Sequence, residues 1–479
     1  MDLQFRADLI ILSLVSCFLF VQTVAGAEES DPDNYLRLTT AYADAMIEHG
    51  MGVRGDTYIP LFAEELDRAT MRMLEGEALE KVAAIPREDW GIRSHDRMLG
   101  GANPQHCQNL YQILYVLSDI TGERRYAENA DASLKYFLEH CQSKATGLFY
   151  WGEHAGWDMR GNKAMEKRSG DIHEFYRPWA LWKRSRQLAP EACRRFAHGL
   201  WEHQIGDHKT GDYSRHAKIS EHGPGTNAPY ARHGGFYIET WAAAYAHTGD
   251  PVLLKAVETV VDGLERARLH DGGYLVGGSV ETGSRRAYDI SLAVSLELAA
   301  NSIPGKLAEK LRAVAAANDD VFDALHPAPG AVSKSDANLW TNAYGSGPRA
   351  GHANTLMLRY RQTQKDAYRR VILAEADMYL GQQINLTSPV WPGTVGEAVW
   401  LMLNAYELTG EEKYLDAAER FAQESADLFL SDNPLPKASH AHNHYEAVTN
   451  GDTLMMALLR LWAIKNNIET KTPLTYTDR

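Results

Sequence analysis

The feature that most constrains the fold of this chain is a repeated helical hairpin. Residues 110–138, 241–264 and 400–430 each combine an apolar helix, a tight turn and an amphipathic helix. All three turns have the pattern Thr-Gly-acid: Thr121-Gly122-Glu123, Thr248-Gly249-Asp250 and Thr409-Gly410-Glu411. Glycine ends the first helix in a left-handed cap, and the acid begins the next helix near its positive dipole end. Each segment is therefore predicted to be an αα-hairpin.

Weaker copies of this hairpin occupy residues 180–204, 292–321 and 356–380, and further helices are predicted at 35–49 and 453–465. The turns recur at a spacing typical of helical arrays. Pairing the first helix with the last would close a ring. We therefore predict an all-α fold, an (α/α) toroid of about six to seven hairpins, as one catalytic domain over residues 28–479. An open solenoid is the alternative, but its hairpins are shorter and more uniform.

Residues 1–27 have the pattern of a secretory signal peptide. Arg6 precedes an apolar run, and Ala25-Gly26-Ala27 supplies the small residues of a cleavage site. A membrane anchor is less favoured, because Ser13, Ser16 and Gln22 interrupt a short run. No later stretch is apolar enough to span a bilayer. We expect a secreted or periplasmic protein with no membrane partner after processing.

The charge of the chain argues against nucleic acid as a partner. The formal net charge is −14, and no basic stripe is present. Only Cys107, Cys141 and Cys193 remain after processing, which excludes a disulfide-rich scaffold and leaves a Cys107–Cys141 bridge open. No cysteine-based metal signature is present, and we expect no cofactor.

Five long connections should lie on one face of the toroid. In such rings the first helix of each hairpin usually lies inside, so the connections before the inner helices gather together. They are residues 142–170, 205–235, 271–285, 326–351 and 431–450, and they are rich in Gly, Trp, Tyr, His and Asn. Polar and aromatic loops at one end of a rigid scaffold are where a functional site is expected.

The first of these connections carries candidate substrate-binding residues. Trp151, Glu153, His154 and Trp157 lie within eight residues of sequence. Aromatic faces can stack on sugar rings while the polar groups bind hydroxyls or a carboxylate. Ordinary loop packing is the alternative reading.

Two predicted helix starts carry further candidates. His173 and Glu174 would lie near the open face, unless they only cap a helix. His233 precedes two glycines that allow close approach of a ligand, and Tyr237 and Glu239 follow on the same helix. A histidine buried in the core is the alternative for His233.

The residues Arg285, Arg286 and Tyr288 enter another inner helix at a similar position. This set fits β-elimination on a uronate. Arg or His can neutralise the substrate carboxylate and stabilise the enolate-like charge. A tyrosine can serve as acid and base if nearby cations keep its phenol deprotonated. We therefore predict Tyr288 as acid/base, with Arg286 and His233 assisting.

The hairpins, the Trp-Gly-Glu-His loop at 151–154, the His-Gly-Gly start at 233–235 and the Arg-Arg-Ala-Tyr-Asp start at 285–289 together resemble polysaccharide lyase family 38. This resemblance implies a metal-independent α/α-toroid lyase acting on alginate or glucuronan. It implies a catalytic tyrosine and an assisting histidine, matching Tyr288 and His233, and it also implies catalytic roles for His154 and Arg286. It also leaves open that the neutralising residue is an asparagine, such as Asn103 or Asn109.

Two later loops add candidates for substrate binding. His352 and Asn354 lie in one, and His444 lies in the other, within the sequence His-Ala-His-Asn-His at 440–444. Alternating histidines could hold zinc. Substrate contacts or loop hydrogen bonds are the favoured reading.

Other functions compete with that of a lyase for an acidic polysaccharide. A glycoside hydrolase acting on uronides would need two carboxylates, for which Glu153, Asp158, Glu174, Glu239, Asp289 and Glu397 offer material. A sugar 2-epimerase would use paired histidines. A non-catalytic glycan-binding protein would share the aromatic cleft but would not need Tyr288 among cations.

Overall fold

The Thr-Gly-acid turns form as the sequence predicts. In the computed structural model, Gly122, Gly249 and Gly410 all have left-handed backbone angles, with φ between 68° and 75°. The threonine has an additional role. In each turn its Oγ1 accepts a hydrogen bond from the backbone N–H of the acid two residues later, at 3.1–3.2 Å. Of the three acids, Asp250 also caps the following helix by accepting from the backbone N–H of Val252.

The structure describes residues 33–479 except 55–56, 169, 173, 215–216, 224–229, 269–273, 278–283, 328–338 and 343–348. The predicted signal peptide and His173 therefore lie outside the described residues. None of the helices in these ranges is both long and apolar enough to cross a membrane.

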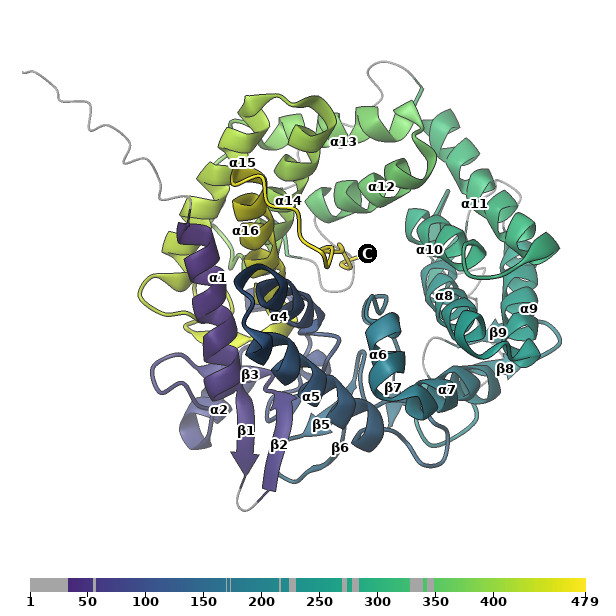
Figure 1. Cartoon of the computed structure of the whole chain (residues 1–479), viewed down its shortest axis with the longest axis horizontal. Coiled ribbons are helices and arrows are strands. Elements are labelled where there is room, and N and C mark those ends of the chain that lie inside the picture. Colours follow the sequence, from purple (N-terminus) through teal and green to yellow (C-terminus); the bar gives the residue numbers. More distant parts are fainter. Residues whose placement is uncertain are drawn as a thin grey trace, which may run out of the picture.

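Helices form two concentric layers of a closed ring (Figure 1). The inner layer consists of α4 (Gln108–Thr121), α6 (Trp182–Leu188), α8 (Ala231–Thr248), α10 (Ile290–Ala300), α12 (Arg349–Thr363), α14 (Pro392–Thr409) and α16 (Gly451–Lys465). The outer layer consists of α1 (Asn34–Ala45), α5 (Arg124–His140), α7 (Pro190–Gly199), α9 (Pro251–Ala267), α11 (Gly305–Leu325), α13 (Asp366–Tyr379) and α15 (Glu412–Ser425). The predicted (α/α) toroid is confirmed.

The ring is closed by its last helix. Helix α16 packs against α14, against α4 and against α1, so the end of the array meets its beginning. The hydroxyl of Thr39 on α1 donates to the backbone carbonyl of Met455 on α16. An open solenoid would leave these faces exposed to solvent. The first and last helices therefore form the seventh pair of the ring.

The inner helices α14 and α16 are buried nearly all round, because they pack against inner neighbours and against an outer helix. Fourteen of the 18 residues of α14 are buried. The outer helices bury one stripe and expose the other face, as α5 and α15 do. One continuous core runs through the described helices. Cys107, Cys141 and Cys193 are buried free thiols within it, so no Cys107–Cys141 bridge is present.

Short elements fill the long connections between the layers. Two helices, α2 (Gly76–Ala83) and α3 (Arg87–Trp90), follow α1. The antiparallel strands are β1 (Met51–Arg54) with β2 (Thr57–Phe62), β3 (Glu65–Asp67) with β13 (His444–Glu446), and the sheet of β4 (Gly101–Ala102), β5 (Ala155–Asp158) and β6 (Lys163–Glu166). The others are β7 (Asp171–Ile172) with β10 (Ala217–Lys218), β8 (Ile205–Asp207) with β9 (Asp212–Tyr213), and β11 (Tyr274–Gly277) with β12 (Ser284–Arg286).

The C-terminal segment runs into the centre of the ring (Figure 1). Residues 472–479 are held there by hydrogen bonds along their length. The backbone N–H of Thr475 donates to Gln112, and the hydroxyl of Thr477 bonds to Asn109, both on α4. Tyr476 is 2% exposed. The C-terminal tail therefore forms part of the inner surface of the ring.

Candidate active site

A cavity of about 470 Å³ lies in the interior of the toroid. Its lining residues come from the starts of inner helices, from the segments that precede them and from the C-terminal tail. They are Tyr176, Arg177, Arg232, Arg286, Ala287, Tyr288, Asp289, Ile290, Ser291, Gly351, His352, Thr355, Glu397, Asn450, Asp478 and Arg479. Helices α8, α10, α12 and α16 begin within a few residues of this lining. Their N-terminal dipole ends favour a negatively charged ligand.

Four arginines reach this cavity: Arg177, Arg232, Arg286 and Arg479. Arg177 is buried, pairs with Asp478 and donates to Asn450 Oδ1 at 2.8 Å. Arg479 donates to Glu239 Oε2 at 2.8 Å and to Ser295 Oγ at 2.8 Å. These two guanidinium groups are therefore fixed by the protein itself.

The other two arginines, Arg232 and Arg286, have different surroundings. Arg232 Nη2 donates to the backbone carbonyl of Tyr176 at 3.1 Å. Burial lowers the pKa of Arg232, although Asp289 and Glu153 act against that shift. Arginine stays charged in proteins, so a partly desolvated guanidinium attracts an anion strongly. Arg286 is exposed on β12.

Tyr288 lies between β12 and α10, at the edge of the cavity. Its ring packs edge-on against Phe322, with centroids 5.1 Å apart, and faces His326 at 6.0 Å. Burial raises the pKa of its phenol above 10, and Arg286 offsets this only in part. The sequence analysis expected cations to hold this phenol deprotonated. The net shift is in the opposite direction, because burial outweighs the one nearby arginine.

Three carboxyl groups also line the cavity. Asp289 accepts from the backbone N–H of Leu292 at 2.8 Å and so caps α10. Glu397 is buried beneath Gly351, where a Cβ atom would lie only 2.7 Å from Glu397 Oε2. Burial, reinforced by Asp478, raises the pKa of Glu397 well above 4.5. This shift favours the protonated form of Glu397 and makes it a candidate proton donor.

Of the residues predicted from the sequence, Arg286, Tyr288 and His352 line the cavity. Glu239 reaches it indirectly through Arg479. Only the backbone of Arg285 is described, in β12.

His233 does not line the cavity, although its neighbour Arg232 does. The ring of His233 is buried against Tyr230 and Phe236, with centroids 6.1 and 6.0 Å away. Successive residues of a helix point about 100° apart, so Arg232 and His233 face different surroundings. Tyr237 and Glu174 are also buried, and the hydroxyl of Tyr237 donates to Glu174 Oε2 at 3.2 Å.

The predicted aromatic loop supplies core residues. Trp151 is fully buried among Phe137, Phe149 and Trp179. Trp157 is half-buried and donates from Nε1 to Asn162 at 2.8 Å. Loop packing, the alternative reading, accounts for the buried Trp151, whereas a substrate contact of the half-buried Trp157 stays a prediction.

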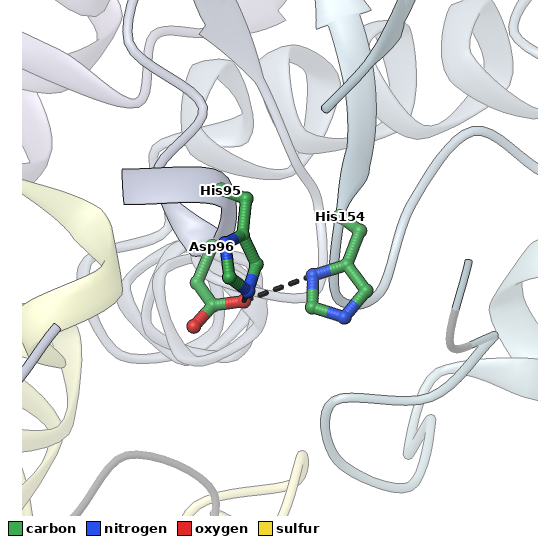
Figure 2. A group of neighbouring side chains, drawn as sticks. All are labelled: His95, Asp96 and His154. Atoms are coloured by element: carbon green, nitrogen blue, oxygen red, sulfur yellow. Dashed lines mark ion pairs between the residues drawn. The ribbon is translucent and has the colours of Figure 1, made fainter. Parts of the chain in front are cut away.

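The neighbouring Glu153 and His154 meet a second polar cluster. Glu153 lies 3.8 Å from Arg93, and His154 Nδ1 lies 2.9 Å from Asp96 Oδ1 (Figure 2). His154 is fully buried and does not line the cavity.

The remaining candidates have structural contacts. Asn354 bonds to the backbone carbonyl of Glu397 and to Asn404, which ties α12 to α14. His444 lies 3.0 Å from Glu446, and His442 bonds to Ser439. Asn103 and Asn109 are buried and bond to Gly152 and Thr453, respectively.

The comparison with known proteins begins with lyases. The family model described as periplasmic pectate lyase matches residues 89–233. A pectate disaccharide-lyase of Dickeya dadantii (strain 3937) is 31% identical over 111 residues, which are 23% of this chain and 20% of that protein. The chain thus matches about a fifth of the length of this relative. These matches favour a polysaccharide-lyase-like toroid, and the narrower resemblance to polysaccharide lyase family 38 stays a prediction.

Solved structures with a similar arrangement include enzymes of other kinds. A family 76 glycoside hydrolase, a mannosidase of Bacteroides thetaiotaomicron, has 11% identity and a TM-score of 0.45, covering 90% of this chain and 99% of its own. Cellobiose 2-epimerase of Spirochaeta thermophila has 12% identity and the same TM-score, covering 90% and 98%.

A second family model covers the larger part of the chain. It matches residues 181–450, which include the starts of α8, α10, α12 and α14 around the cavity. The protein is a carbohydrate-active enzyme, and with more than half of its residues matched it belongs to the family described as β-L-arabinofuranosidase, GH127 catalytic domain.

Proposed function

We propose that this protein is a polysaccharide lyase that cleaves a uronate-containing polysaccharide by β-elimination in the arginine-lined cavity. The observation that carries the proposal is the convergence of four arginines and Tyr288 on one cavity. Arg177 and Arg479 already pair with Asp478 and Glu239, so Arg232 and Arg286 are the cations that a uronate carboxylate would bind, whereas a neutral sugar brings no charge for them. The helix N-termini around the lining act in the same direction.

Pectate is the substrate to test first. It is a polymer of uronate, and both the pectate lyase family match and the Dickeya relative carry its name. The side of the cavity formed by Tyr176, Arg177 and Arg232 falls inside the segment matched by that family. Alginate and glucuronan, implied by the resemblance to family 38, come next.

In the proposed reaction, Arg232 and Arg286 bind the substrate carboxylate and lower the cost of charge on it when the C5 proton leaves. His352, an exposed imidazole of the lining, accepts that proton. The electron pair of the C5–H bond forms the C4–C5 double bond, and the bond from C4 to the glycosidic oxygen breaks. Tyr288 donates its proton to this oxygen, a role that suits a phenol whose pKa is above 10.

Hydrolysis of an acidic sugar is the second candidate, and one observation favours it. Burial raises the pKa of Glu397, which favours its protonated form, and Glu397 shares the cavity with Asp289 and Asp478. A protonated acid together with an ionised carboxylate is the pair that glycoside hydrolases use. The membership of the GH127 family is in keeping with this reading.

One assay separates the two reactions. Purified protein is incubated with pectate, alginate and glucuronan while reducing ends and the ultraviolet absorbance of an unsaturated product are followed together. The lyase proposal requires both signals to rise on at least one polymer. Reducing ends without absorbance would replace it with hydrolysis, and neither signal on any of the three would reject it for these substrates.

A further inference from the structure

Asn450, the residue before α16, has an unusual backbone conformation. Its φ is 57° and its ψ is 41°, a left-handed region that residues other than glycine seldom adopt. The start of α14 leaves room for it, because a Cβ atom on Gly393 would lie only 2.5 Å from Asn450 Cβ. Backbone conformations of this kind cluster at functional sites. The side chain of Asn450 is therefore worth following into the ring.

Asn450 lines the cavity, and its side chain does not cap α16. Asparagine is among the commonest N-cap residues, so this side chain has another use. Its Oδ1 accepts a hydrogen bond from Arg177 Nη2 at 2.8 Å, and Arg177 also pairs with Asp478. Because Oδ1 faces the guanidinium, the amide N–H₂ is the group of Asn450 that can donate to another residue.

The residue that receives this hydrogen bond is Tyr176, which also lines the cavity. Burial raises the pKa of the Tyr176 phenol, while Arg177 and the hydrogen bond from Asn450 act against the rise. The phenol therefore keeps its proton at neutral pH and can donate it in a hydrogen bond. The backbone carbonyl of Tyr176 accepts from Arg232 Nη2 at 3.1 Å. Tyr176 thus lies between Asn450 and the arginine assigned to the substrate carboxylate.

We propose that the Tyr176 hydroxyl binds a hydroxyl group of the uronate whose carboxylate meets Arg232, and that Asn450 is the positioning residue that holds this phenol. The inference rests on the proposed function, which supplies the uronate. The contacts run in the order Asp478, Arg177, Asn450, Tyr176 and Arg232. A buried group that hydrogen-bonds a substrate hydroxyl selects for sugars that carry it.

A purely structural role for Asn450 is the competing explanation. In that case its substitution would disturb the start of α16, and the loss would add to any loss caused by removing the Tyr176 hydroxyl. A positioning residue acts through Tyr176, so its effect should vanish once that hydroxyl is absent.

The test is a double-mutant cycle of Asn450→Asp and Tyr176→Phe, measured on the uronate polymer that the unmodified chain cleaves fastest. Asn450→Asp keeps an oxygen for Arg177 and removes the amide donor, and Tyr176→Phe removes only the hydroxyl. Each variant should lower kcat/KM by about 10-fold, as expected for the loss of one hydrogen bond. The double variant should also be lowered by about 10-fold, and not by about 100-fold.

Two further variants separate positioning from folding. Asn450→Gly removes the whole side chain but adopts the left-handed backbone freely, so it should keep the fold and reproduce the loss in kcat/KM. Asn467→Gly is the matched control, because Asn467 is exposed and has a φ of 52°. Its kcat/KM should equal that of the unmodified chain. Urea unfolding of all variants checks the fold.

The rate is followed by the release of reducing ends, which elimination and hydrolysis both produce, so a change of reaction type leaves the test intact. Unchanged kcat/KM in Asn450→Asp, or losses that multiply to about 100-fold in the double variant, would overturn the positioning role. If the unmodified chain releases no reducing ends, the proposed function fails. The same cycle, measured as the Kd for a uronate trimer prepared from pectate, then decides the role of Asn450, and absence of binding rejects it.

Discussion

At the scale of single residues, the account depends first on the hydroxyl of Tyr288. We predict that Tyr288→Phe keeps the fold and lowers turnover on the uronate polymer by at least about 100-fold, because only the proton donor is removed. The steady-state rate of unsaturated product formation measures this. Tyr136→Phe is the matched control, since its hydroxyl bonds to Asn162 on the outer side of the ring. Near-normal turnover in Tyr288→Phe would remove Tyr288 from the reaction.

Arg232 should stabilise charge that develops on the substrate carboxylate. We predict that Arg232→Gln lowers kcat by about 100-fold or more, because a charged donor in a water-poor cavity is lost. Arg124→Gln on the exposed face of α5 is the control, with a side chain 87% exposed. If Arg232→Gln raised KM alone, Arg232 would only bind the substrate and would not stabilise the transition state.

Glu446 and Arg97 form a buried ion pair with two hydrogen bonds, at 2.8 and 2.6 Å. Burial alone would raise the pKa of Glu446, but Arg97 and His444 lower it from 4.5 to about 2. A carboxyl whose pKa is lower in the folded state stabilises the fold above its unfolded pKa. That stabilisation should fall as the pH decreases from about 4.5 to about 2.

We predict that Glu446→Gln lowers the free energy of unfolding at pH 7 by about 3 kcal/mol, because Arg97 stays buried without a charged partner. Urea unfolding at pH 7 and pH 3 measures this, and the difference between variant and parent should shrink at the lower pH. Glu77→Gln removes an exposed pair with Lys81 and should change the value by no more than about 0.5 kcal/mol. An equal loss at both pH values would contradict the assignment.

The residue scale also shows what sequence reasoning could locate. Arg286 and Tyr288 were found because they enter a predicted inner helix, and His352 because it lies in a loop just before another predicted helix. The sequence analysis chose His233 and missed Arg232. A short sequence motif does not show which residue at the start of a helix points toward the cavity. Arg177 was missed because its acidic partner, Asp478, lies 301 residues away in the sequence. Only the folded ring brings the two residues together.

At the scale of elements, hairpins are the part of the fold that local chemistry specifies. The glycine cap and the threonine hydroxyl act within a few residues, so their effect is visible in the sequence. The C-terminal tail has no such signal. Residues 472–479 form no helix or strand, and what positions them is contact with α4, α14 and α16.

Asp478 should link this tail to the rest of the cavity. It pairs with Arg177 and accepts from Thr453 on α16 at 2.7 Å. We predict that Asp478→Ala lowers the free energy of unfolding by about 3 kcal/mol and reduces activity, because Arg177 loses its charged partner inside the ring. Thermal and urea unfolding measure the first effect. Thr472→Ala, at the outer end of the tail, is the control, and a stable, fully active Asp478→Ala would show that the tail only covers the cavity.

At the scale of the whole molecule, ring closure should make the helices unfold together. One core runs through the described helices, and α16 joins the end of the array to α1 and α4. We predict one urea transition, with coincident midpoints for tryptophan fluorescence and far-ultraviolet circular dichroism. Separate transitions would indicate that the hairpins unfold as in an open repeat array.

The ring also explains why both elimination and hydrolysis are compatible with the repeated hairpins of this sequence. The scaffold brings the starts of several inner helices around one cavity, and the lining side chains decide the reaction. Here the lining offers arginines with a tyrosine, which suit elimination, and Glu397 with a raised pKa, which suits the acid of a hydrolase. The fold alone does not choose between them.

The most direct test of the central claim is the mass of the products formed from pectate. Elimination breaks the chain without adding water, so the fragment bearing the new non-reducing end is lighter than the saturated oligomer by the mass of one water. We predict such unsaturated fragments by mass spectrometry, and their loss in Tyr288→Phe. Fragments with only saturated masses would contradict elimination and assign the arginine-lined cavity to a hydrolase.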